Sequence, residues 1–326
     1  MPYESFARVA VLGLGTMGHA IAQSFAAAGH QVHGYDESPP ARRSVHDRVR
    51  ANLDAFIAAG LTTPNEAAAI LERIRVFDSE RAALADVRFV TEAVREELAA
   101  KQDLFARIEE SVSDDAILAS NSSTFTISQS GSRLRRPERA LVTHWFNPPH
   151  IVPTVEVVPS PRTDPAATEA TLALLRRLGK LAIHVRQEIP GFLVNRIQIA
   201  VMREVWDLLD RGVASVEDID AAVRGSMGFR LAALGPLAIH DFGGLDIQEI
   251  VYRELAPDLR GGAEIPPTVR ALIDEGHLGY KSGRGFYDYS GDEGELRRRT
   301  RDERYLQLLK LFHAPASESG HGRKEP

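Results

Sequence analysis

A histidine and a glutamate twelve residues apart are the first candidates for chemistry in this sequence. His144 ends one apolar run and Glu156 stands inside the next, in the stretch THWFNPPHIVPTVEVVP (residues 143–159). A buried carboxylate needs a partner, because burying the charge alone is costly. If His144 is that partner, Glu156 would fix the ring tautomer and leave the other ring nitrogen free to accept a proton. The alternative is that Glu156 lies on the solvated face of an edge strand.

Three further polar residues stand where a site is expected. Ser123 follows one predicted strand in LASNSST, Asn147 follows the next in HWFNPP, and Asn195 comes early in a long predicted helix. Ligands of open parallel sheets bind beyond the carboxyl ends of strands, and domain boundaries are another common place for a site. Each residue also has a structural reading: Ser123 as a helix cap, Asn195 as the partner of a loop, and His144 as a buried, hydrogen-bonded histidine.

A glycine-rich turn near the N-terminus predicts a dinucleotide site. Gly13, Gly15 and Gly18 form GxGxxG between a predicted strand and a predicted helix, and Asp36 ends the second strand eighteen residues after Gly18. The first glycine permits the turn, the second lets a pyrophosphate approach the helix N-terminus, and the third lets the helix pack on the sheet. Asp36 would accept hydrogen bonds from the ribose hydroxyls and repel a 2′-phosphate, which favours NAD over NADP. An ordinary turn and an FAD site are the alternatives.

The hydrophobic pattern predicts an α/β domain followed by an all-α domain. Strands and helices alternate through about residue 187, which is typical of a Rossmann-type doubly wound parallel sheet. We therefore expect an NAD-binding domain over 1–187, a helical substrate and dimerisation domain over 188–312, and a disordered tail over 313–326. The strands are predicted at 8–12, 31–36, 87–93, 116–120, 140–145, 154–158 and 181–186, and the main helices at 41–60, 64–75, 97–111, 166–178 and 189–212.

Composition excludes several classes of protein. The chain has 326 residues and a net charge of −6, which gives no basic field for nucleic acid. It has no cysteine, which excludes disulfides and thiolate metal sites and fits a reducing compartment. No signal peptide precedes the first strand, and no apolar run approaches the ~20 residues that span a membrane. We expect a cytoplasmic protein.

The motifs together resemble the 3-hydroxyacyl-CoA dehydrogenase family. They are GxGxxG, EAVxExxxxK, SNSS, HWFNP, a glutamate twelve residues after the histidine, PGFLVNR and GxKxGxGFYDY, in the family's order, over about residues 7–289. The resemblance implies NAD-dependent oxidation of a secondary alcohol to a ketone, in a homodimer formed through the helical domain. A non-catalytic dinucleotide-binding or structural protein, as among lens crystallins of this family, is the non-enzyme alternative.

The resemblance also implies a role for each site residue. His144 is expected to be the general base and Glu156 its orienting partner. Ser123 and Asn195 would hydrogen-bond the substrate oxygen, with Asn147 in support. Glu96 and Lys101 match the family's contacts to the nicotinamide ribose. The remaining cofactor contacts are expected at Gly13, Gly15, Thr16, Met17, Gly18, Asp36 and Ala93.

Two departures from the acyl-CoA enzymes leave the substrate open. Their helix pair after the second strand carries lysines that meet CoA phosphates, whereas this chain has alanines there, with arginines nearby. The segment GSMGFRLAALGPL resembles the lambda-crystallin (L-gulonate 3-dehydrogenase) branch and contains Arg230, which is suited to bind a free carboxylate or to form an interdomain ion pair. The motifs DFGGLD and KSGRGFYDY resemble the acyl-CoA enzymes instead. In the helix pair, the alanines are Ala51, Ala55 and Ala59, and the nearby arginines are Arg42, Arg43, Arg48 and Arg50.

Overall fold

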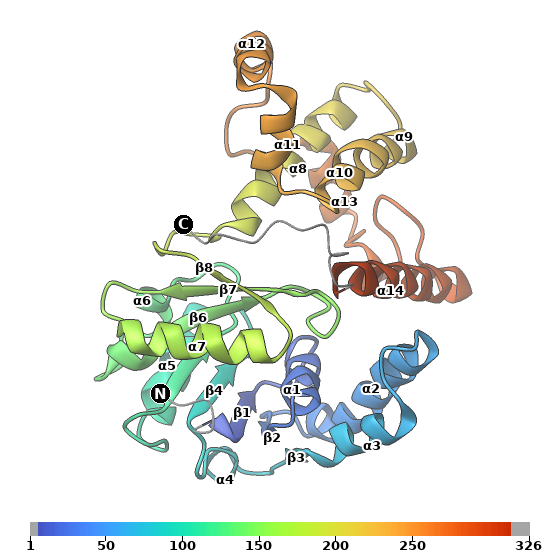
Figure 1. Ribbon diagram of the computed structural model, residues 1–326. Coiled ribbons are helices and arrows are strands. Elements are labelled where there is room, and N and C mark those ends of the chain that lie inside the picture. Colours follow the sequence, from blue (N-terminus) through green and yellow to red (C-terminus); the bar gives the residue numbers. More distant parts are fainter. Residues whose placement is uncertain (1–5, 314–326) are drawn as a thin grey trace, which may run out of the picture. The chain divides into compact units, whose positions relative to one another are not determined.

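The computed structural model describes residues 6–313, which divide into two compact units (Figure 1). The first unit contains the chain up to Leu193 together with the residues from Arg301 onward, and the second contains Val194–Thr300. The predicted disordered tail after His313 lies outside the described residues. None of the described helices combines the length and apolar character needed to cross a membrane.

The first unit is built on one mixed sheet that confirms the predicted doubly wound architecture. Within residues 6–313 the sheet has eight strands in the order β3-β2-β1-β4-β5-β6-β7-β8. Every neighbouring pair is parallel except β6 and β7, which form an antiparallel pair. The strands are β1 (Arg8–Leu12), β2 (Gln31–Tyr35), β3 (Ile74–Val76), β4 (Phe89–Glu92), β5 (Ile117–Ser120), β6 (Ala140–Trp145), β7 (Thr154–Pro159) and β8 (Leu181–His184).

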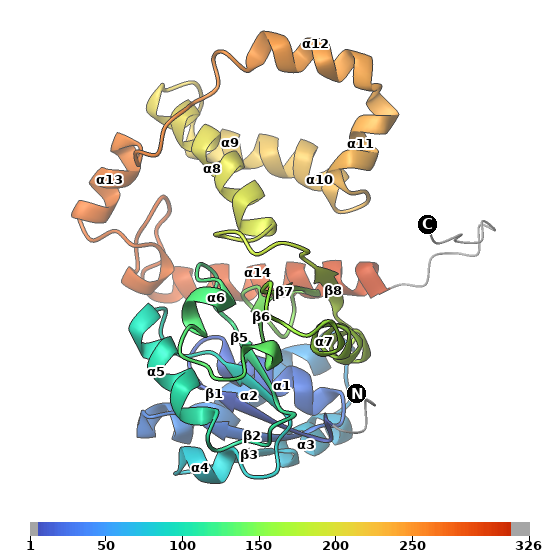
Figure 2. The same ribbon diagram turned by 90° about the vertical axis from the view of Figure 1, so that its left-hand side faces the viewer.

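Helices cover both faces of this sheet, which explains why its strands are almost continuously apolar. In β1, Val9 and Val11 belong to the core under α1, α2, α3 and α7, while Ala10 and Leu12 belong to the core under α5 and α6. Figure 2 shows α5 and α6 on one side of the strands and α7 on the other. The helices are α1 (Gly18–Ala27), α2 (Pro39–Ala58), α3 (Pro64–Glu72), α4 (Glu80–Ala83), α5 (Leu98–Ile108), α6 (Ile127–Ser130) and α7 (Pro165–Arg177).

Two predicted elements differ from the structure. The helix predicted over 64–75 ends at Glu72, and the next residues form β3, which is too short to show a period in the sequence. The helix predicted over 189–212 begins only at Val194, because Gly191 and Phe192 have φ angles of 75° and 51° that no right-handed helix can accommodate.

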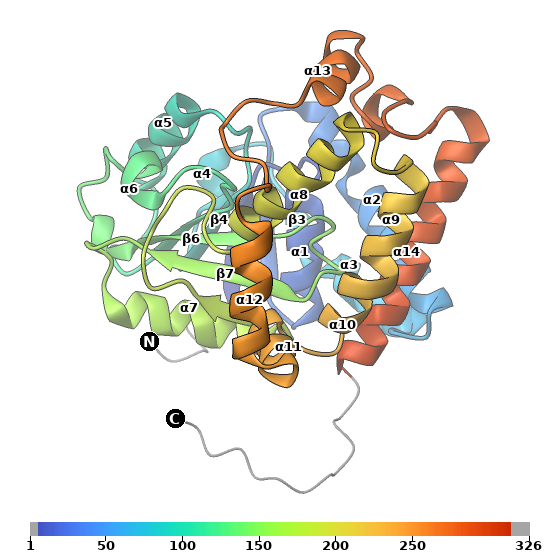
Figure 3. The ribbon, with the colours of Figure 1, turned by 90° about the horizontal axis from the view of Figure 1, so that it is seen from above.

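The second unit is helical, as predicted, but it buries very little. Within Val194–Thr300 only Ile219, Pro266 and Gly294 are buried, although α8 has a clear apolar stripe. In Figure 3, α11 and α12 form a connected helix pair. The helices are α8 (Val194–Asp210), α9 (Val216–Val223), a π-helical turn (Arg224–Gly228), α10 (Phe229–Leu231), α11 (Pro236–Gly243), α12 (Leu245–Leu255), α13 (Pro267–Asp274) and α14 (Gly291–His313).

The last helix, α14, continues from the second unit into the first. Its residues Leu306 and Leu309 are 2% and 9% exposed and form a small core with Ile151. Phe56 and Ala59, at the end of α2, pack against this core. The carboxyl-terminal half of α14 therefore covers one side of the α2–α3 helix pair.

We predict that His150 makes the protein less stable in mild acid. Its ring lies 5.8 Å from the ring of Phe56, and its buried Nδ1 has no hydrogen-bond partner among the described residues. Burial, with a smaller effect from the charges of His19, Lys180 and Arg301, lowers the pKa of His150 from 6.5 to about 3. Because the unfolded chain binds a proton that the folded chain does not, the free energy of unfolding should fall as the pH drops from 6.5 toward 3.

The loss between about pH 7 and about pH 5 should be on the order of 2 kcal/mol for this one group. Urea unfolding of the wild type and of His150→Gln at the two pH values measures it. The variant should lose less stability on acidification than the wild type by about that amount. An identical pH dependence in both proteins would contradict the assignment.

Candidate active site

His144 and Glu156 face each other across the antiparallel pair of β6 and β7. The register places the two residues directly opposite, and His144 Nδ1 lies 2.8 Å from Glu156 Oε2. The side chains are 5% and 0% exposed, so Glu156 is not on a solvated face. The other carboxylate oxygen, Oε1, accepts a hydrogen bond of 3.1 Å from the backbone N–H of Leu193.

This geometry assigns the two ring nitrogens of His144. A carboxylate oxygen accepts, so Nδ1 must carry the proton that it donates to Glu156. Nε2 is then the nitrogen that can accept a proton from a substrate, and Glu156 stabilises the charged ring that results. The pair is therefore suited to general base chemistry.

Two phenylalanines that the sequence reasoning did not single out enclose the histidine. The ring of Phe146 lies 4.4 Å from the His144 ring, and the ring of Phe192 lies 5.5 Å from it. Phe192 is fully buried and adopts the left-handed conformation, which turns the chain so that the next residue, Leu193, can donate to Glu156. Its place in PGFLVNR, three residues before the predicted site residue Asn195, was the available signal.

The loop that carries Ser123 is held by Glu96. One oxygen of Glu96, Oε1, accepts hydrogen bonds from Ser122 Oγ at 2.5 Å, from the N–H of Ser123 at 3.0 Å and from the N–H of Thr124 at 3.2 Å. Asn121, the residue before Ser122, accepts a hydrogen bond from the N–H of Trp145 at the end of β6. Because β5 and β6 are parallel neighbours, Ser123 follows one strand and His144 lies near the end of the next, at the same edge of the sheet.

Lys101 is a buried cation between two carboxylates. Its side chain is 1% exposed, and its ammonium lies 2.7 Å from Glu92 and 3.1 Å from Glu96. Its expected contact to the nicotinamide ribose stays a prediction. Glu92 is a further functional candidate that the sequence reasoning did not single out, although it opens the EAVxExxxxK motif.

The glycine turn fits a dinucleotide. Gly13 has a φ of 88°, and a Cβ on Gly18 would lie 1.7 Å from the carbonyl oxygen of Gly13, so both positions require glycine. A Cβ on Gly15 would meet nothing within 4 Å, which leaves open space in front of the first turn of α1. Asp36 accepts hydrogen bonds from the N–H groups of Leu14 at 2.6 Å and Ser38 at 2.7 Å. The predicted cofactor residues Thr16, Met17 and Ala93 are exposed or partly exposed beside this space.

Arg48 stabilises the same glycine turn through hydrogen bonds to backbone carbonyls. Its guanidinium donates to the carbonyl oxygens of Leu14 at 2.6 Å, Gly15 at 3.0 Å and Ala41 at 3.1 Å. Burial lowers the pKa of Arg48, which the charge of Asp36 opposes. The expectation that Arg48 could meet a CoA phosphate is therefore replaced by a role in shaping the cofactor turn. Arg50, in contrast, is exposed, and its one ion pair within residues 6–313 is with Asp47.

The other predicted substrate residues lie in a loop and in the second unit. Asn147 is exposed in the connection from β6 to β7. Asn195 is the second residue of α8, two positions after the N–H group that bonds Glu156. Arg230, in α10, is exposed and donates only to Ser226, at 3.4 and 3.5 Å. Among the described residues it has no acidic partner, so the alternative of an ion pair is not observed.

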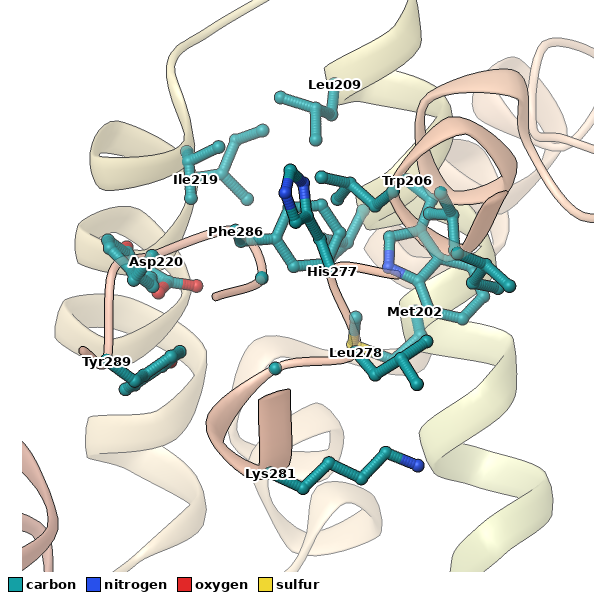
Figure 4. Close-up of a pocket in the computed structure, with 18 residues that line it drawn as sticks. Met202, Trp206, Leu209, Ile219, Asp220, His277, Leu278, Lys281, Phe286 and Tyr289 are labelled. Atoms are coloured by element: carbon teal, nitrogen blue, oxygen red, sulfur yellow. The ribbon is translucent and has the colours of Figure 1, made fainter. Parts of the chain in front are cut away.

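The helical unit has a separate pocket of about 440 Å³, shown in Figure 4. The segment GFYDY forms part of its wall, and Tyr287 there donates to Asp220 at 2.8 Å. Burial and this hydrogen bond raise the pKa of Tyr287 to about 12. Trp206 and Phe286 point into the hollow in Figure 4. None of the predicted site residues lines this pocket, so the motif serves here to pack the helices.

The sheet topology, the glycine turn with Asp36, and the buried His144–Glu156 pair define an NAD-dependent oxidoreductase. The family model for the 3-hydroxyacyl-CoA dehydrogenase NAD-binding domain matches residues 8–189, and the model for the C-terminal domain of the same family matches residues 191–289. The chain belongs to the 3-hydroxyacyl-CoA dehydrogenase family.

Relatives within the family differ in substrate. The chain is 32% identical to 5-formyl-3-hydroxy-2-methylpyridine 4-carboxylate 5-dehydrogenase of Mesorhizobium japonicum, over 93% of this chain and 97% of that protein. A crystal structure of an enzyme of that name superposes with a TM-score of 0.89 and covers 95% of this chain and 99% of that one, at 31% identity. The chain is also 32% identical to 3-hydroxybutyryl-CoA dehydrogenase of Mycobacterium tuberculosis, over 88% of this chain and 99% of that protein. Lambda-crystallin of Oryctolagus cuniculus is 33% identical, over 70% of this chain and 72% of that protein.

Proposed function

We propose that this protein oxidises a secondary alcohol, with His144 as the general base and Glu156 as its orienting partner. The observation that carries the proposal is the buried contact of 2.8 Å between His144 Nδ1 and Glu156 Oε2. Nε2 takes the hydroxyl proton, and Ser123 and Asn195 hydrogen-bond the substrate oxygen, with Asn147 in support. The turn at Gly13, Gly15 and Gly18, with Asp36, would hold NAD, which would supply the hydride acceptor for the carbinol carbon. The product is a ketone.

We further propose that the substrate is a small molecule with a free carboxylate rather than a CoA thioester. One relative, matched over 93% of this chain against 88% for the 3-hydroxybutyryl-CoA dehydrogenase of Mycobacterium tuberculosis, is named for a pyridine carboxylate. Both family models end by Tyr289, and α14, which begins at Gly291, lies beyond them. Its leucines pack on Phe56 and Ala59, on the helix pair that carries CoA-binding lysines in the acyl-CoA enzymes. A 3-hydroxyacyl-CoA is the second candidate, favoured by the identity to 3-hydroxybutyryl-CoA dehydrogenases.

Arg230 provides a test between these two substrate classes. A free carboxylate that loses water on binding must be paired, and Arg230 has no acidic partner among the described residues. If the substrate is a free acid, Arg230→Ala should raise its KM about ten- to hundredfold, the value of a charge-assisted hydrogen bond. If the substrate is an acyl-CoA, the same variant should be nearly silent.

The matched control is Arg50→Ala, which removes an exposed arginine whose one ion pair among the described residues is with Asp47. It should leave the KM of a free acid unchanged. KM values for L-3-hydroxybutyryl-CoA, L-3-hydroxybutyrate and L-gulonate, with each protein, make the measurement. An effect of Arg230→Ala on NAD affinity alone would contradict both substrate assignments.

We also propose that the protein forms a homodimer through its helical unit. This unit has only three buried residues among those described, while Leu237 and Phe242 of α11 are 81% and 83% exposed. Apolar surface of this extent is typical of a protein interface. Light scattering should give twice the mass of one chain, and Phe242→Lys should shift the protein toward the monomer. A monomeric wild type at micromolar concentration would contradict the proposal.

A further inference from the structure

We propose that Glu92, buried at the end of β4, is a positioning residue that sets both the cofactor-facing Glu96 and the Ser123 loop through Lys101. The inference rests on the proposed function, because it takes Glu96 and Ser123 to face the cofactor and the substrate. Glu92 itself is fully buried and is placed to act only through its neighbours.

Glu92 is held by three donors. It accepts a hydrogen bond of 2.8 Å from the N–H of Val94, one of 2.7 Å from Ser120 Oγ and one of 2.7 Å from Lys101 Nζ. Glu92 and Ser120 are also direct neighbours in the register of β4 and β5. The carboxylate is therefore fixed to the central strands of the sheet, and such full satisfaction is what a buried charge requires.

Lys101 connects the buried Glu92 to a carboxylate that is partly exposed. Its ammonium, on α5, bridges the buried Glu92 and the partly exposed Glu96. An ammonium that is 1% exposed cannot exchange either carboxylate for water. The position of Lys101 therefore depends on Glu92, and the position of Glu96 Oε2 depends on Lys101.

Glu96 positions the Ser123 loop through hydrogen bonds. Its Oε1 accepts the three hydrogen bonds from Ser122, Ser123 and Thr124 described above. Burial alone would raise the pKa of Glu96, but the hydrogen bond from Ser122 and the charge of Lys101 outweigh it and lower the pKa. One carboxylate thus holds the loop with Oε1 and Lys101 with Oε2. A displaced Lys101 would shift Glu96, and with it Ser123.

The decisive variants are Glu92→Gln and the double variant Glu92→Gln/Lys101→Met. In Glu92→Gln, Lys101 keeps only Glu96 as a charged partner and should draw it away from the loop. NAD binding, measured by calorimetry without substrate, should weaken about tenfold, and kcat should fall about ten- to hundredfold. The matched control is Thr91→Val, beside Glu92 in β4, because the buried Thr91 Oγ1 has no hydrogen-bond partner among the described residues. This variant keeps Glu92, Lys101 and Glu96 and should behave like the wild type.

The double variant separates positioning from stability. It removes both buried charges together, so its thermal unfolding temperature should recover toward that of the wild type. Its NAD affinity and kcat should stay low, because Glu96 has still lost Lys101. Recovery of affinity and kcat together with stability would overturn the proposal, as would wild-type kinetics in Glu92→Gln. If the wild type itself binds no NAD, the proposed function fails instead.

Discussion

Replacing Glu156 by glutamine should lower kcat by about 10²- to 10⁴-fold while NAD affinity stays unchanged. The reason lies in the two hydrogen bonds that the carboxylate accepts, one from His144 Nδ1 and one from the N–H of Leu193. A glutamine has one oxygen and one NH₂ group, so it can accept only one of them. If its oxygen serves Leu193, its NH₂ faces Nδ1, and the ring proton moves to Nε2, the nitrogen that must accept the substrate's proton.

Steady-state kinetics and NAD calorimetry on the purified variant make the measurement. The matched control is Thr143→Val, in the same strand as His144, since the buried Thr143 Oγ1 has no hydrogen-bond partner among the described residues. This change should leave kcat close to that of the wild type. A Glu156→Gln variant that keeps near-wild-type turnover would remove Glu156 from the mechanism.

Gly15→Ala should abolish most NAD binding without changing the stability of the fold. The added Cβ would meet nothing within 4 Å of protein, so the first unit should fold as before. The same methyl group would occupy the open space in front of α1, where the pyrophosphate approaches the backbone. We expect NAD affinity to fall by at least about tenfold, measured by calorimetry, with an unchanged thermal unfolding temperature.

Gly18→Ala is the contrasting variant. Its Cβ would lie 1.7 Å from the carbonyl oxygen of Gly13, so the helix would have to move away from the turn. This variant should lose stability as well as NAD binding. A Gly15→Ala protein that binds NAD as the wild type does would show that the pyrophosphate does not pass over this residue.

Much of the fold was predictable because its signals are local. The alternation of apolar strands and helices gave the doubly wound sheet, and GxGxxG gave the cofactor turn, because sterics at Gly13 and Gly18 admit no side chain. The contact between His144 and Glu156 was predictable for a different reason. A carboxylate between apolar neighbours needs a partner, and His144, twelve residues earlier at the end of another apolar run, was the candidate that the sequence offered.

Other features depend on contacts between distant segments, which no local pattern reports. The left-handed Phe192 is set by its packing against His144 and by the bond from Leu193 to Glu156. Lys101 was expected at the nicotinamide ribose and Arg48 near a CoA phosphate. The sequence does not show that the first is enclosed by carboxylates and that the second donates to backbone carbonyls. The antiparallel course of β7 was likewise not evident from its composition.

The central claim is tested most directly by the rate of NADH formation. The wild type and His144→Gln are measured side by side on the three compounds named for the Arg230 test. The account predicts that the wild type forms NADH with at least one compound and that His144→Gln, still binding NAD, forms it at least about a hundredfold more slowly. Undiminished NADH formation by His144→Gln would show that the proton goes elsewhere. A wild type that binds NAD yet oxidises none of the compounds would contradict the proposed oxidation of these substrates.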